Sequence, residues 1–540
     1  MQRRVSKVSF GSQAMKLLKT YDVDTIFGIP GVHTIEYYRG ITETGIKGVV
    51  PRHEQGAGFM ADGYARISGK PGVCVLVSGP GVLNAATPIA QAWHDSIPML
   101  VLAASTESEL SGKNRGPLHD VPDQAGFFTQ LTDASVTVSD PDQFAEVVAQ
   151  AFASWKVNRA RPVHISVPFD VLSKDVSEIK RVEVALPARH VTADDLAKVV
   201  AQVSAAKKIV LICGGGANYA HSQIRALAEK LNSPVITTGN ARGLLPDGHP
   251  LNAGTTLPFS GGQSLIASAD LVIAIGTEFS DVDIIYTGKR VPQPQSMIRV
   301  DLDSTQLQAG LKADIGVVSD AANFASELLA ALNASGFTSG YESAATDAAT
   351  ARGDIGWTNQ SRSHFEWLDV ISELMPENAI VSIDSTQLAY TAHHYTPWST
   401  PKRWLAPYGL GTLGPAVPMG IGAKVAAPND PVVIIAGDGG VLFTISELAT
   451  ARDVSGTIVT IIWDNAGYGE IRDSFDRAKA DRNGVDISSF DLTVVAQGFG
   501  MNASRVRTPA ELHTQFKKAL TMKTPSVIVV TEPGSPADHK

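Results

Sequence analysis

Two polar residues that each follow an apolar run could together hold a divalent cation. Asp438 lies after the run 432–436, within the sequence Gly-Asp-Gly-Gly, and Asn465 lies after the run 457–463. We interpret both runs as buried strands, and parallel strands open their carboxyl ends on the same edge of a sheet, where ligands bind. Carboxylate, amide and carbonyl oxygens suit Mg²⁺ or Ca²⁺ bridging to a diphosphate, whose oxygens glycine N–H groups can contact. The alternative is a pair of ordinary strand-to-helix turns, because Gly-Asp-Gly by itself is common.

A glutamate before a segment rich in small residues is the second chemical signal. Glu54 precedes the sequence Gln-Gly-Ala-Gly-Phe-Met-Ala, and residues 56–67 have the composition of a tightly packed helix. Taken alone, Glu54 could simply be a carboxylate that interacts favourably with the positive end of that helix. Its significance comes from the segments that accompany it.

Six segments together resemble the thiamine-diphosphate-dependent enzymes of the acetolactate synthase, pyruvate oxidase and benzoylformate decarboxylase superfamily. They are Gly28-Ile-Pro-Gly31, Arg52-His-Glu-Gln-Gly-Ala57, Ser78-Gly-Pro-Gly81 with Asn84, Gly409-Leu-Gly-Thr-Leu-Gly414, Gly437-Asp-Gly439 and Asn465. The resemblance covers essentially the whole chain. It implies a pyrimidine-binding, a central and a diphosphate-binding domain, in that order. It also implies a homodimer or homotetramer whose active sites lie between the first domain of one subunit and the third domain of its partner.

The resemblance further implies a role for each matching residue. Mg²⁺ would be held by Asp438, Asn465 and the carbonyl oxygen of Gly467. The diphosphate would be surrounded by Ser385, Thr386, Gln387, Gly437, Gly439, Gly440, Tyr468 and Gly469. The pyrimidine side would be lined by Pro30, Pro80 and Asn84, with the Gly411 carbonyl facing the 4′-amino group and Leu413 beneath the bent cofactor.

The implied reaction is the loss of CO₂ from a 2-oxo acid. Such an acid resists decarboxylation unless an electron sink is provided, and thiamine diphosphate is that sink in this superfamily. Glu54 would hydrogen-bond pyrimidine N1′ and so help the cofactor to lose its reactive proton, an intramolecular step that depends on position. We expect non-oxidative decarboxylation to an aldehyde, and the alternative is a carboligase of the acetolactate synthase type that acts on pyruvate.

Within the superfamily, several segments point away from acetolactate synthase and from the flavin-binding members. Glu278, Asp281 and Asp283 would repel a flavin diphosphate where flavin-binding relatives carry a basic residue, so we expect no FAD. Asp123 precedes the active-site Gln124, where acetolactate synthase has an aromatic residue. The segments that instead resemble 5-guanidino-2-oxopentanoate (2-ketoarginine) decarboxylases are 28–34, 118–124, 240–246, 384–387 and 467–471.

A cationic substrate would explain two acidic residues near the expected pocket. Asp123 and Glu470 could grip a guanidinium group from opposite walls. The alternative is that both are solvated or pair with Arg115 or Arg472. His33 is a candidate proton shuttle, because an imidazole titrates in a useful range, although it could equally be a hydrogen-bonding histidine without a catalytic role.

The elements that must position these residues alternate along the chain. Buried strands are predicted at 73–77, 99–102, 163–167, 209–212, 271–275, 432–435 and 458–462, and helices at 56–67 and 446–453. Strands that are apolar throughout indicate parallel sheets covered on both faces, hence an α/β fold with three doubly wound parallel-sheet domains. The first and third blocks share a rhythm, because each has a glycine-rich loop directly after an apolar strand.

Two seams divide the chain into three blocks. Residues 174–192 carry scattered charges and prolines, and residues 334–356 are rich in Ala, Ser, Thr and Gly and are interpreted as the better linker. We therefore expect domains at 1–175, 190–335 and 355–540.

Composition excludes several other classes of protein. The 540 residues are 44% hydrophobic and 18% charged, which is typical of a globular chain. No apolar run approaches the roughly 20 residues of a membrane helix, and no apolar core of a signal peptide follows the basic start. The formal net charge of −9 argues against nucleic-acid binding. Only two cysteines, Cys74 and Cys213, are present, and they indicate a reducing compartment, so we expect a cytoplasmic enzyme.

Overall fold

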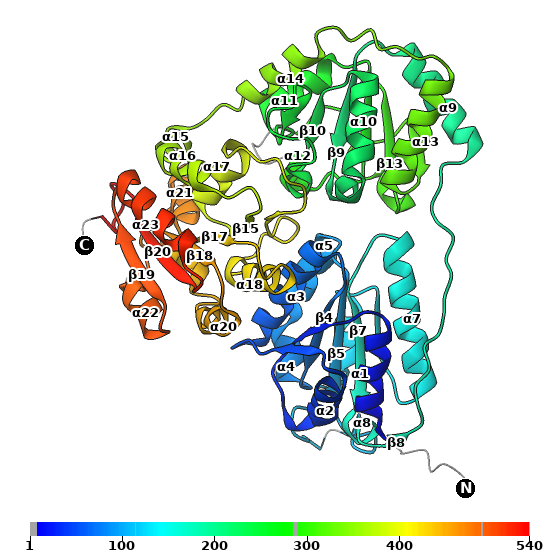
Figure 1. Cartoon of the computed structure of the whole chain (residues 1–540), viewed down its shortest axis with the longest axis vertical. Helices are drawn as coiled ribbons and strands as arrows, with labels where there is room; N and C mark the ends of the chain where they lie inside the picture. Colours follow the sequence, from blue (N-terminus) through cyan, green and yellow to red (C-terminus); the bar gives the residue numbers. More distant parts are fainter. Residues whose placement is uncertain (1–7, 114, 285–289, 488–489, 539–540) are drawn as a thin grey trace.

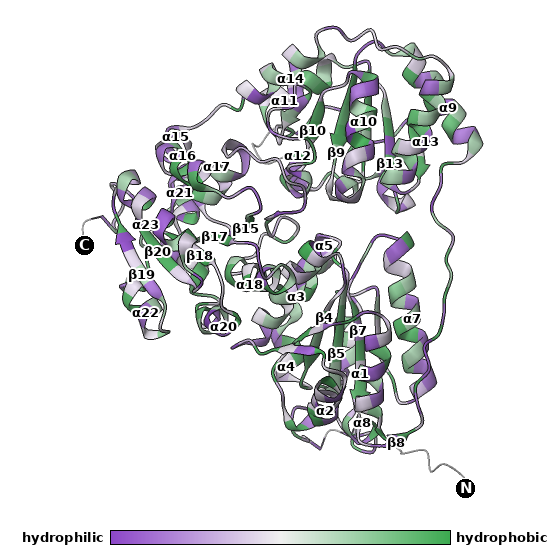
Figure 2. Ribbon diagram, in the orientation of Figure 1, coloured by the Kyte–Doolittle hydropathy of each residue, from purple (hydrophilic) through white to green (hydrophobic). Residues whose placement is uncertain are grey.

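Three α/β units, each built on a six-stranded parallel sheet, make up the chain in a computed structural model that describes residues 8–113, 115–284, 290–487 and 490–538 (Figure 1). The prediction of three doubly wound parallel-sheet domains is confirmed. All seven predicted strands are strands of these sheets. Their apolar residues pack on both faces, and the strands are coloured as hydrophobic in Figure 2. Among the described residues no helix is long and apolar enough to span a membrane.

The first unit contains the sheet β3-β2-β4-β5-β7-β6. Its strands are β2 (Thr25–Phe27), β3 (Lys47–Val49), β4 (Gly72–Leu76), β5 (Met99–Ser105), β6 (Ala134–Thr137) and β7 (Val163–Pro168). Its helices are α1 (Phe10–Thr20), α2 (Ile35–Thr44), α3 (Glu54–Ser68), α4 (Pro80–Asn84), α5 (Ala86–His94), α6 (Gln124–Phe128), α7 (Pro141–Val157) and α8 (Phe169–Leu172). A small antiparallel pair, β1 (Val8–Ser9) with β8 (Asp175–Val176), ties the start of this unit to its end.

The third unit repeats the topology of the first. Its sheet runs β16-β15-β17-β18-β20-β19, so both units place their strands in the same relative order. The strands are β15 (Ile380–Ile383), β16 (Trp404–Leu405), β17 (Val432–Gly437), β18 (Ile458–Asp464), β19 (Asn502–Val506) and β20 (Ser526–Thr531). The helices are α15 (Asn359–Ser363), α16 (Phe365–Leu374), α17 (Gln387–Tyr395), α18 (Ala416–Ala426), α19 (Asp438–Val441), α20 (Glu447–Val454), α21 (Gly469–Ala478), α22 (Leu492–Gly498) and α23 (Pro509–Thr521). The rhythm seen in the sequence therefore reflects a shared fold.

The central unit has a different strand order, β11-β10-β9-β12-β13-β14, which is the dinucleotide-binding order. The strands are β9 (Ile209–Cys213), β10 (Val235–Thr237), β11 (Asn252–Gly254), β12 (Leu271–Ile275), β13 (Met297–Asp301) and β14 (Ile315–Val318). The helices are α9 (Ala193–Ala205), α10 (His221–Leu231), α11 (Ser260–Ser268), α12 (Asp281–Ile284), α13 (Ala321–Ala334) and α14 (Ala344–Gly353). Residues 177–192, which contain no helix or strand, connect this unit to the first.

The interpretation of residues 334–356 as a linker is wrong for the middle of that segment. Residues 344–353 form α14, which packs against α11 and β11 of the central unit. Ala344, Ala348 and Ala351 are all buried, and their spacing of four and three residues is that of one helix face. The helix was not predicted because small alanine side chains give only a weak hydrophobic pattern, although the helical spacing of the buried positions can be seen in the sequence.

The first and third units share one apolar core. Helix α3 of the first unit packs along α18 of the third, and residues from both sheets join the same buried cluster, for example Phe27 and Ile434. Two glycines allow this approach, because a Cβ added at Gly63 would clash with the Met419 carbonyl and one added at Gly422 would clash with that of Met60. The start of α3, and Glu54 with it, is thus held against the third unit of its own chain.

Candidate active site

The expected diphosphate side lies where the connections of the third sheet change direction. Thr386 follows β15 and Gly437 ends β17, and these two strands are neighbours in the sheet. Loops on either side of such a switch point form the usual ligand crevice of an open α/β sheet. The loops touch, since a Cβ added at Gly437 would lie 2.8 Å from Thr386 Oγ1. The structure thus brings together the residues expected around the diphosphate.

Asp438 and Asn465 form a buried group of oxygens at this edge. Asp438 Oδ2 accepts a hydrogen bond of 2.9 Å from the N–H of Gly467, and Oδ1 accepts one of 3.5 Å from the N–H of Asn465. Asn465 Nδ2 donates to Gln387 Oε1 at 3.3 Å, whereas the buried Asn465 Oδ1 has no partner within the part of the chain that the structure describes. Burial, followed by the nearby Asp464, raises the pKa of Asp438 to about 6. A divalent cation would satisfy both the orphaned amide oxygen and the desolvated carboxylate, so these residues fit the expected metal.

The backbone between Asn465 and Gly467, two of the three expected metal ligands, is strained and is supported by Arg472. Ala466 has φ +60°, a left-handed conformation that is uncommon for residues with a side chain. The guanidinium of Arg472 donates to the carbonyl of Ala466 at 3.1 Å and pairs with Asp486 at 3.0 Å. Arg472 therefore supports this loop. The sequence did not indicate this role, because it depends on the orientation of α21.

The glycine-rich loop 409–414 is anchored to the same edge. The N–H of Gly414 donates to the carboxylate of Asp384 at 3.0 Å, and the Ser385 hydroxyl lies 3.5 Å from the carbonyl oxygen of Gly411. Burial raises the pKa of Asp384 to about 6. Gly411 has φ +67°, and Leu413 on the same loop is half-buried. Asp384, which was not singled out in the sequence, therefore joins the loop of Gly411 and Leu413 to the residues expected at the diphosphate.

The first unit carries a second group of predicted residues at the equivalent switch point, between β2 and β4. Glu54 is the first residue of α3, and its Oε2 accepts a hydrogen bond of 3.0 Å from Asn84 Nδ2. Pro30 follows β2, and Pro80 begins α4 directly after β4. The Glu54 carboxylate is half-buried and has no cationic partner among the described residues, so it is available to a ligand.

His33 lies across the same switch point. Its Nδ1 is 2.5 Å from Ser78 Oγ, and its ring centroid is 5.4 Å from that of His119. Burial, and then the neighbouring His119, lower the pKa of His33. His119 itself has φ +61° and a buried Nδ1 that has no partner among the described residues. The place of His119 beside His33 is a finding of the structure.

The side chains of Gln124 and Asp123 form hydrogen bonds within the first unit. Gln124 is buried; its Oε1 accepts a hydrogen bond of 3.0 Å from the N–H of Gly79, and its Nε2 donates to Ala104 and to Ser166. These contacts hold the Gln124 side chain against the loop that leads to Pro80. Asp123 Oδ1 accepts a hydrogen bond of 2.7 Å from Gly126, so this residue caps α6.

Glu470 lies at the start of α21, beside the metal candidates. Its Oε1 pairs with Arg477 at 2.8 Å, and Gln387 donates to its Oε2 at 3.4 Å. The side chain is 42% exposed, and its cationic partner is neither Arg472 nor Arg115. A partly exposed ion pair of this kind can be exchanged for a cationic ligand at little cost.

In one chain these residues form two separate groups. The described hydrogen bonds of Glu54 and His33 stay within the first unit, and those of Asp438 and Asn465 stay within the third. No described hydrogen bond links one group to the other.

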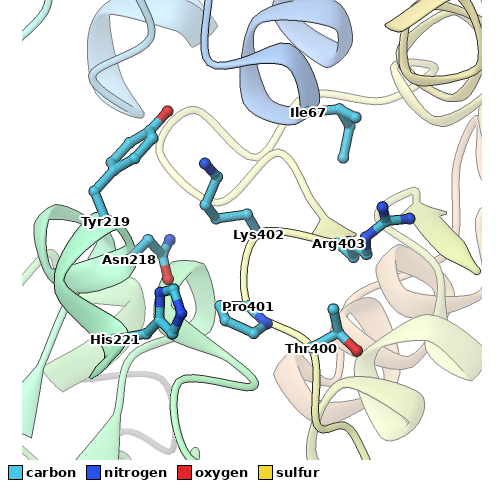
Figure 3. Close-up of a pocket in the computed structure, with 8 residues that line it drawn as sticks. All are labelled: Ile67, Asn218, Tyr219, His221, Thr400, Pro401, Lys402 and Arg403. Atoms are coloured by element: carbon cyan, nitrogen blue, oxygen red, sulfur yellow. The ribbon is translucent and has the colours of Figure 1, made fainter. Parts of the chain in front are cut away.

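A separate hollow of about 400 Å³ lies where the three units meet (Figure 3). It is lined by Ile67, Asn218, Tyr219, His221, Thr400, Pro401, Lys402 and Arg403. Figure 3 shows Lys402 pointing toward Tyr219, whose ring centroid lies 3.7 Å from its Nζ, while Arg403 turns away and pairs with Asp430 at 2.7 Å. Its cations therefore do not converge, and it contains none of the predicted site residues.

Three family models match successive parts of the chain. They describe the N-terminal TPP binding domain of thiamine pyrophosphate enzymes at residues 9–127, the central domain at 196–328 and the C-terminal TPP binding domain at 384–530. The chain belongs to the thiamine pyrophosphate enzymes, which are those that use thiamine diphosphate. The family expected from the sequence is thus confirmed, and the two groups of site residues fall in the two cofactor-binding domains.

Curated relatives refine this placement. The chain is 41% identical over 507 residues to a probable 2-ketoarginine decarboxylase, AruI, of Pseudomonas aeruginosa, covering 93% of this chain and 89% of the relative. It is 30% identical to the acetolactate synthase large subunit of Lactococcus lactis, covering 98% and 93%. The large subunit of acetolactate synthase isozyme 1 of Escherichia coli is 29% identical, with 95% and 92% covered.

Proposed function

We propose that the protein is a thiamine-diphosphate- and Mg²⁺-dependent enzyme that converts a 2-oxo acid to an aldehyde and CO₂ without oxidation. The observation that carries this proposal is the buried Asn465 Oδ1, which has no partner among the described residues and belongs to a residue whose N–H contacts the desolvated Asp438 carboxylate. An orphaned buried acceptor next to a buried carboxylate is costly unless a cation completes the site. The carbonyl of Gly467 would be the third protein ligand.

When bound, thiamine diphosphate supplies the electron sink for the electrons that remain after CO₂ leaves. The chain's own residues bind and orient it. The loops that carry Ser385, Gln387, Gly439, Gly440 and Gly469 would hold the diphosphate, and Leu413 and the carbonyl of Gly411 would contact the cofactor from the loop that Asp384 anchors. Glu54 would hydrogen-bond the pyrimidine, with Asn84 holding the carboxylate in place.

The proposed active unit is a homodimer or a larger homo-oligomer. Because the two groups of residues are separate in one chain, we assign Glu54 and His33 of one subunit to the cofactor held by Asp438 of the other. His33 would hold or release a proton at its ring nitrogen near the reacting carbon, supported by Ser78 and His119.

The proposed substrate class is a 2-oxo acid with a cationic end, such as 5-guanidino-2-oxopentanoate. The relative with 41% identity is named a probable 2-ketoarginine decarboxylase. In addition, Glu470 provides a partly exposed carboxylate near the expected metal ligands of the third domain. A guanidinium could replace Arg477 as the partner of Glu470, with a geometry suited to two parallel hydrogen bonds. Asp123 is less well placed for this role because it caps a helix.

The direct test is CO₂ release by the purified protein, supplied with thiamine diphosphate and Mg²⁺, from a panel of 2-oxo acids with cationic, neutral and acidic side chains. We expect release, with formation of the matching aldehyde, to be fastest for the guanidino acid and to stop when EDTA removes the metal. Absence of CO₂ from every member of the panel would contradict the proposal.

A carboligase that acts on pyruvate is the second candidate, favoured by relatives named acetolactate synthase that are about 30% identical over nearly the whole chain. Incubation with pyruvate alone separates the two functions. A carboligase would form acetolactate, whereas the decarboxylase proposed above would form little product or only acetaldehyde.

A further inference from the structure

The carboxylate of Glu447 is one of the most enclosed acidic groups among the described residues. Glu447 is the first residue of α20, nine positions after Asp438, and it is 0% exposed. Its Oε1 accepts hydrogen bonds of 3.0 Å from the backbone N–H groups of Arg52 and His53. Its Oε2 accepts one of 2.6 Å from the Thr450 hydroxyl. A side chain of the third domain therefore binds two backbone N–H groups of the first domain.

The two N–H groups that Glu447 binds belong to the residues directly before Glu54. They precede the first residue of α3, so the helix itself offers them no acceptor, and a negative charge at this end interacts favourably with the helix. His53 caps the helix from its own side, because its Nδ1 accepts a hydrogen bond of 3.1 Å from the N–H of Gln55. Glu447 thus fixes the backbone from which the Glu54 side chain extends.

The sequence of α3 is adapted to this contact. A Cβ added at Gly56 would clash with Glu447 Oε1, so glycine at this position leaves the space that the carboxylate occupies. No lysine or arginine forms an ion pair with Glu447 among the described residues, and the Arg52 side chain instead pairs with Asp453 at the surface. A buried carboxylate without a cation is costly to retain. The presence of Glu447 despite this cost is explained if the residue supports the active site.

We propose that Glu447 is a positioning residue for Glu54, holding the start of α3 so that the Glu54 carboxylate meets the cofactor in the geometry needed for proton transfer. This inference rests on the proposed function. It assigns no contact with substrate or cofactor to Glu447. A shift of about 1 Å in a group that acts by position can cost about 10²-fold in rate, so a contact to the two residues directly before Glu54 is sufficient to matter.

The first experiment measures amide hydrogen exchange at Arg52 and His53 in the full-length protein without cofactor. Glu447→Met removes both acceptor oxygens at nearly constant length, and we expect these amides to exchange at least about fivefold faster. Glu447→Gln keeps one carbonyl oxygen for the two N–H groups, with Thr450 free to accept from the new amide, and should retain most of the protection. Asp453→Asn, in the same helix, is the matched control and should leave both amides unchanged.

The second experiment measures thiamine diphosphate affinity and the exchange rate of its C2 proton in the saturated proteins. In Glu447→Met we expect C2 exchange to fall by about 10²-fold while the Kd changes by no more than about twofold, because the diphosphate site is intact. Glu447→Gln should lie close to the wild type, and Gly56→Ala, which crowds the carboxylate from the other side, should reproduce the loss.

These measurements separate the positioning role from a structural one and from the proposed function itself. Unchanged amide exchange in Glu447→Met, or faster amide exchange with wild-type C2 exchange, would overturn the positioning role and leave the proposed function standing. A wild-type protein that takes up no thiamine diphosphate in the presence of Mg²⁺ would overturn the proposed function, whatever the amides of the variants show.

Discussion

The carboxylate of Glu54, the first residue of α3, accepts a hydrogen bond of 3.0 Å from the side-chain amide of Asn84, the last residue of α4. The amide leaves Glu54 Oε1 free of side-chain partners among the described hydrogen bonds. Helix α3 begins at Glu54 and packs against α18, which holds the backbone of the helix in place. A half-buried acid with one oxygen held and the other open is arranged to share a proton with a ligand.

Replacing Glu54 with Gln should therefore stop chemistry without preventing binding. Removal of a positioned acid–base group typically costs about 10²–10⁴-fold. We expect the C2 proton of bound thiamine diphosphate to exchange slower by that factor, measured by quenched-flow exchange and NMR, while calorimetry shows nearly unchanged cofactor uptake. Wild-type exchange in this variant would remove Glu54 from the mechanism.

The pair of Asp438 and Asn465 should control metal-dependent cofactor binding. Because even indirect supports of a metal site cost about 10–100-fold in affinity, loss of the Asp438 ligand in Asp438→Ala should weaken thiamine diphosphate binding by at least about 100-fold. EDTA should have the same effect on the wild-type protein, and added Mg²⁺ should reverse it there but not in the variant. Calorimetry that found equal affinity in both proteins would count against the metal site.

Glu470 should select for a cationic substrate. Glu470→Gln removes the charge that now pairs with Arg477, and a hydrogen bond to a charged group is worth about 1.5–3 kcal/mol before allowance for solvent exposure. We expect kcat/KM for 5-guanidino-2-oxopentanoate to fall about tenfold, with little change for a neutral 2-oxo acid of similar length. Arg477→Gln, which frees the carboxylate, should have the opposite or no effect, and equal losses on both substrates would exclude the guanidinium contact.

The pH dependence of the reaction should report His33. Burial and the neighbouring His119 lower the pKa of His33 below its ordinary value of 6.5, so its neutral form persists as the pH falls and is lost only below that value. If the neutral ring is required, the acid limb of kcat/KM lies below pH 6.5. His119→Asn removes one of the two causes of the lowered pKa and retains a residue that tolerates φ +61°, so the limb should move to higher pH. An unmoved limb in this variant, or the same limb in His33→Ala, would show that another group titrates.

The close packing of α3 on α18 should be sensitive to a single methyl group. Gly63→Ala places a Cβ against the Met419 carbonyl, and overpacking of this kind costs about 1–3 kcal/mol. We expect a lower free energy of unfolding in urea and, since α3 must move, slower C2 exchange as well. Gly248→Ala, where nothing lies within 4 Å of the added Cβ, is the control and should unfold like the wild type.

Much of the fold was determined locally. Continuous apolar runs such as 432–435 predict parallel strands wherever they occur, because only a strand covered on both faces hides such a run from water. The positions of Asp438 and Asn465 at the ends of two such strands placed them at one sheet edge. The helix at 344–353 was not predicted from the sequence, because its small alanine side chains give only a weak hydrophobic pattern.

Residues whose roles depend on partners far away in the chain were decided only by the tertiary structure. Glu447 lies some 395 positions from Arg52, and nothing in its own neighbourhood indicates that it binds the turn before Glu54. Gln124 and Asp123 lie in a segment that predicts a substrate site, and only the structure shows that Gln124 is buried and that Asp123 caps a helix. Local composition sets which strands and helices form. The direction of each side chain is set by what packs against it, which is why the sequence by itself predicted the class of chemistry, whereas the contacts of each carboxylate could be read only from the structure.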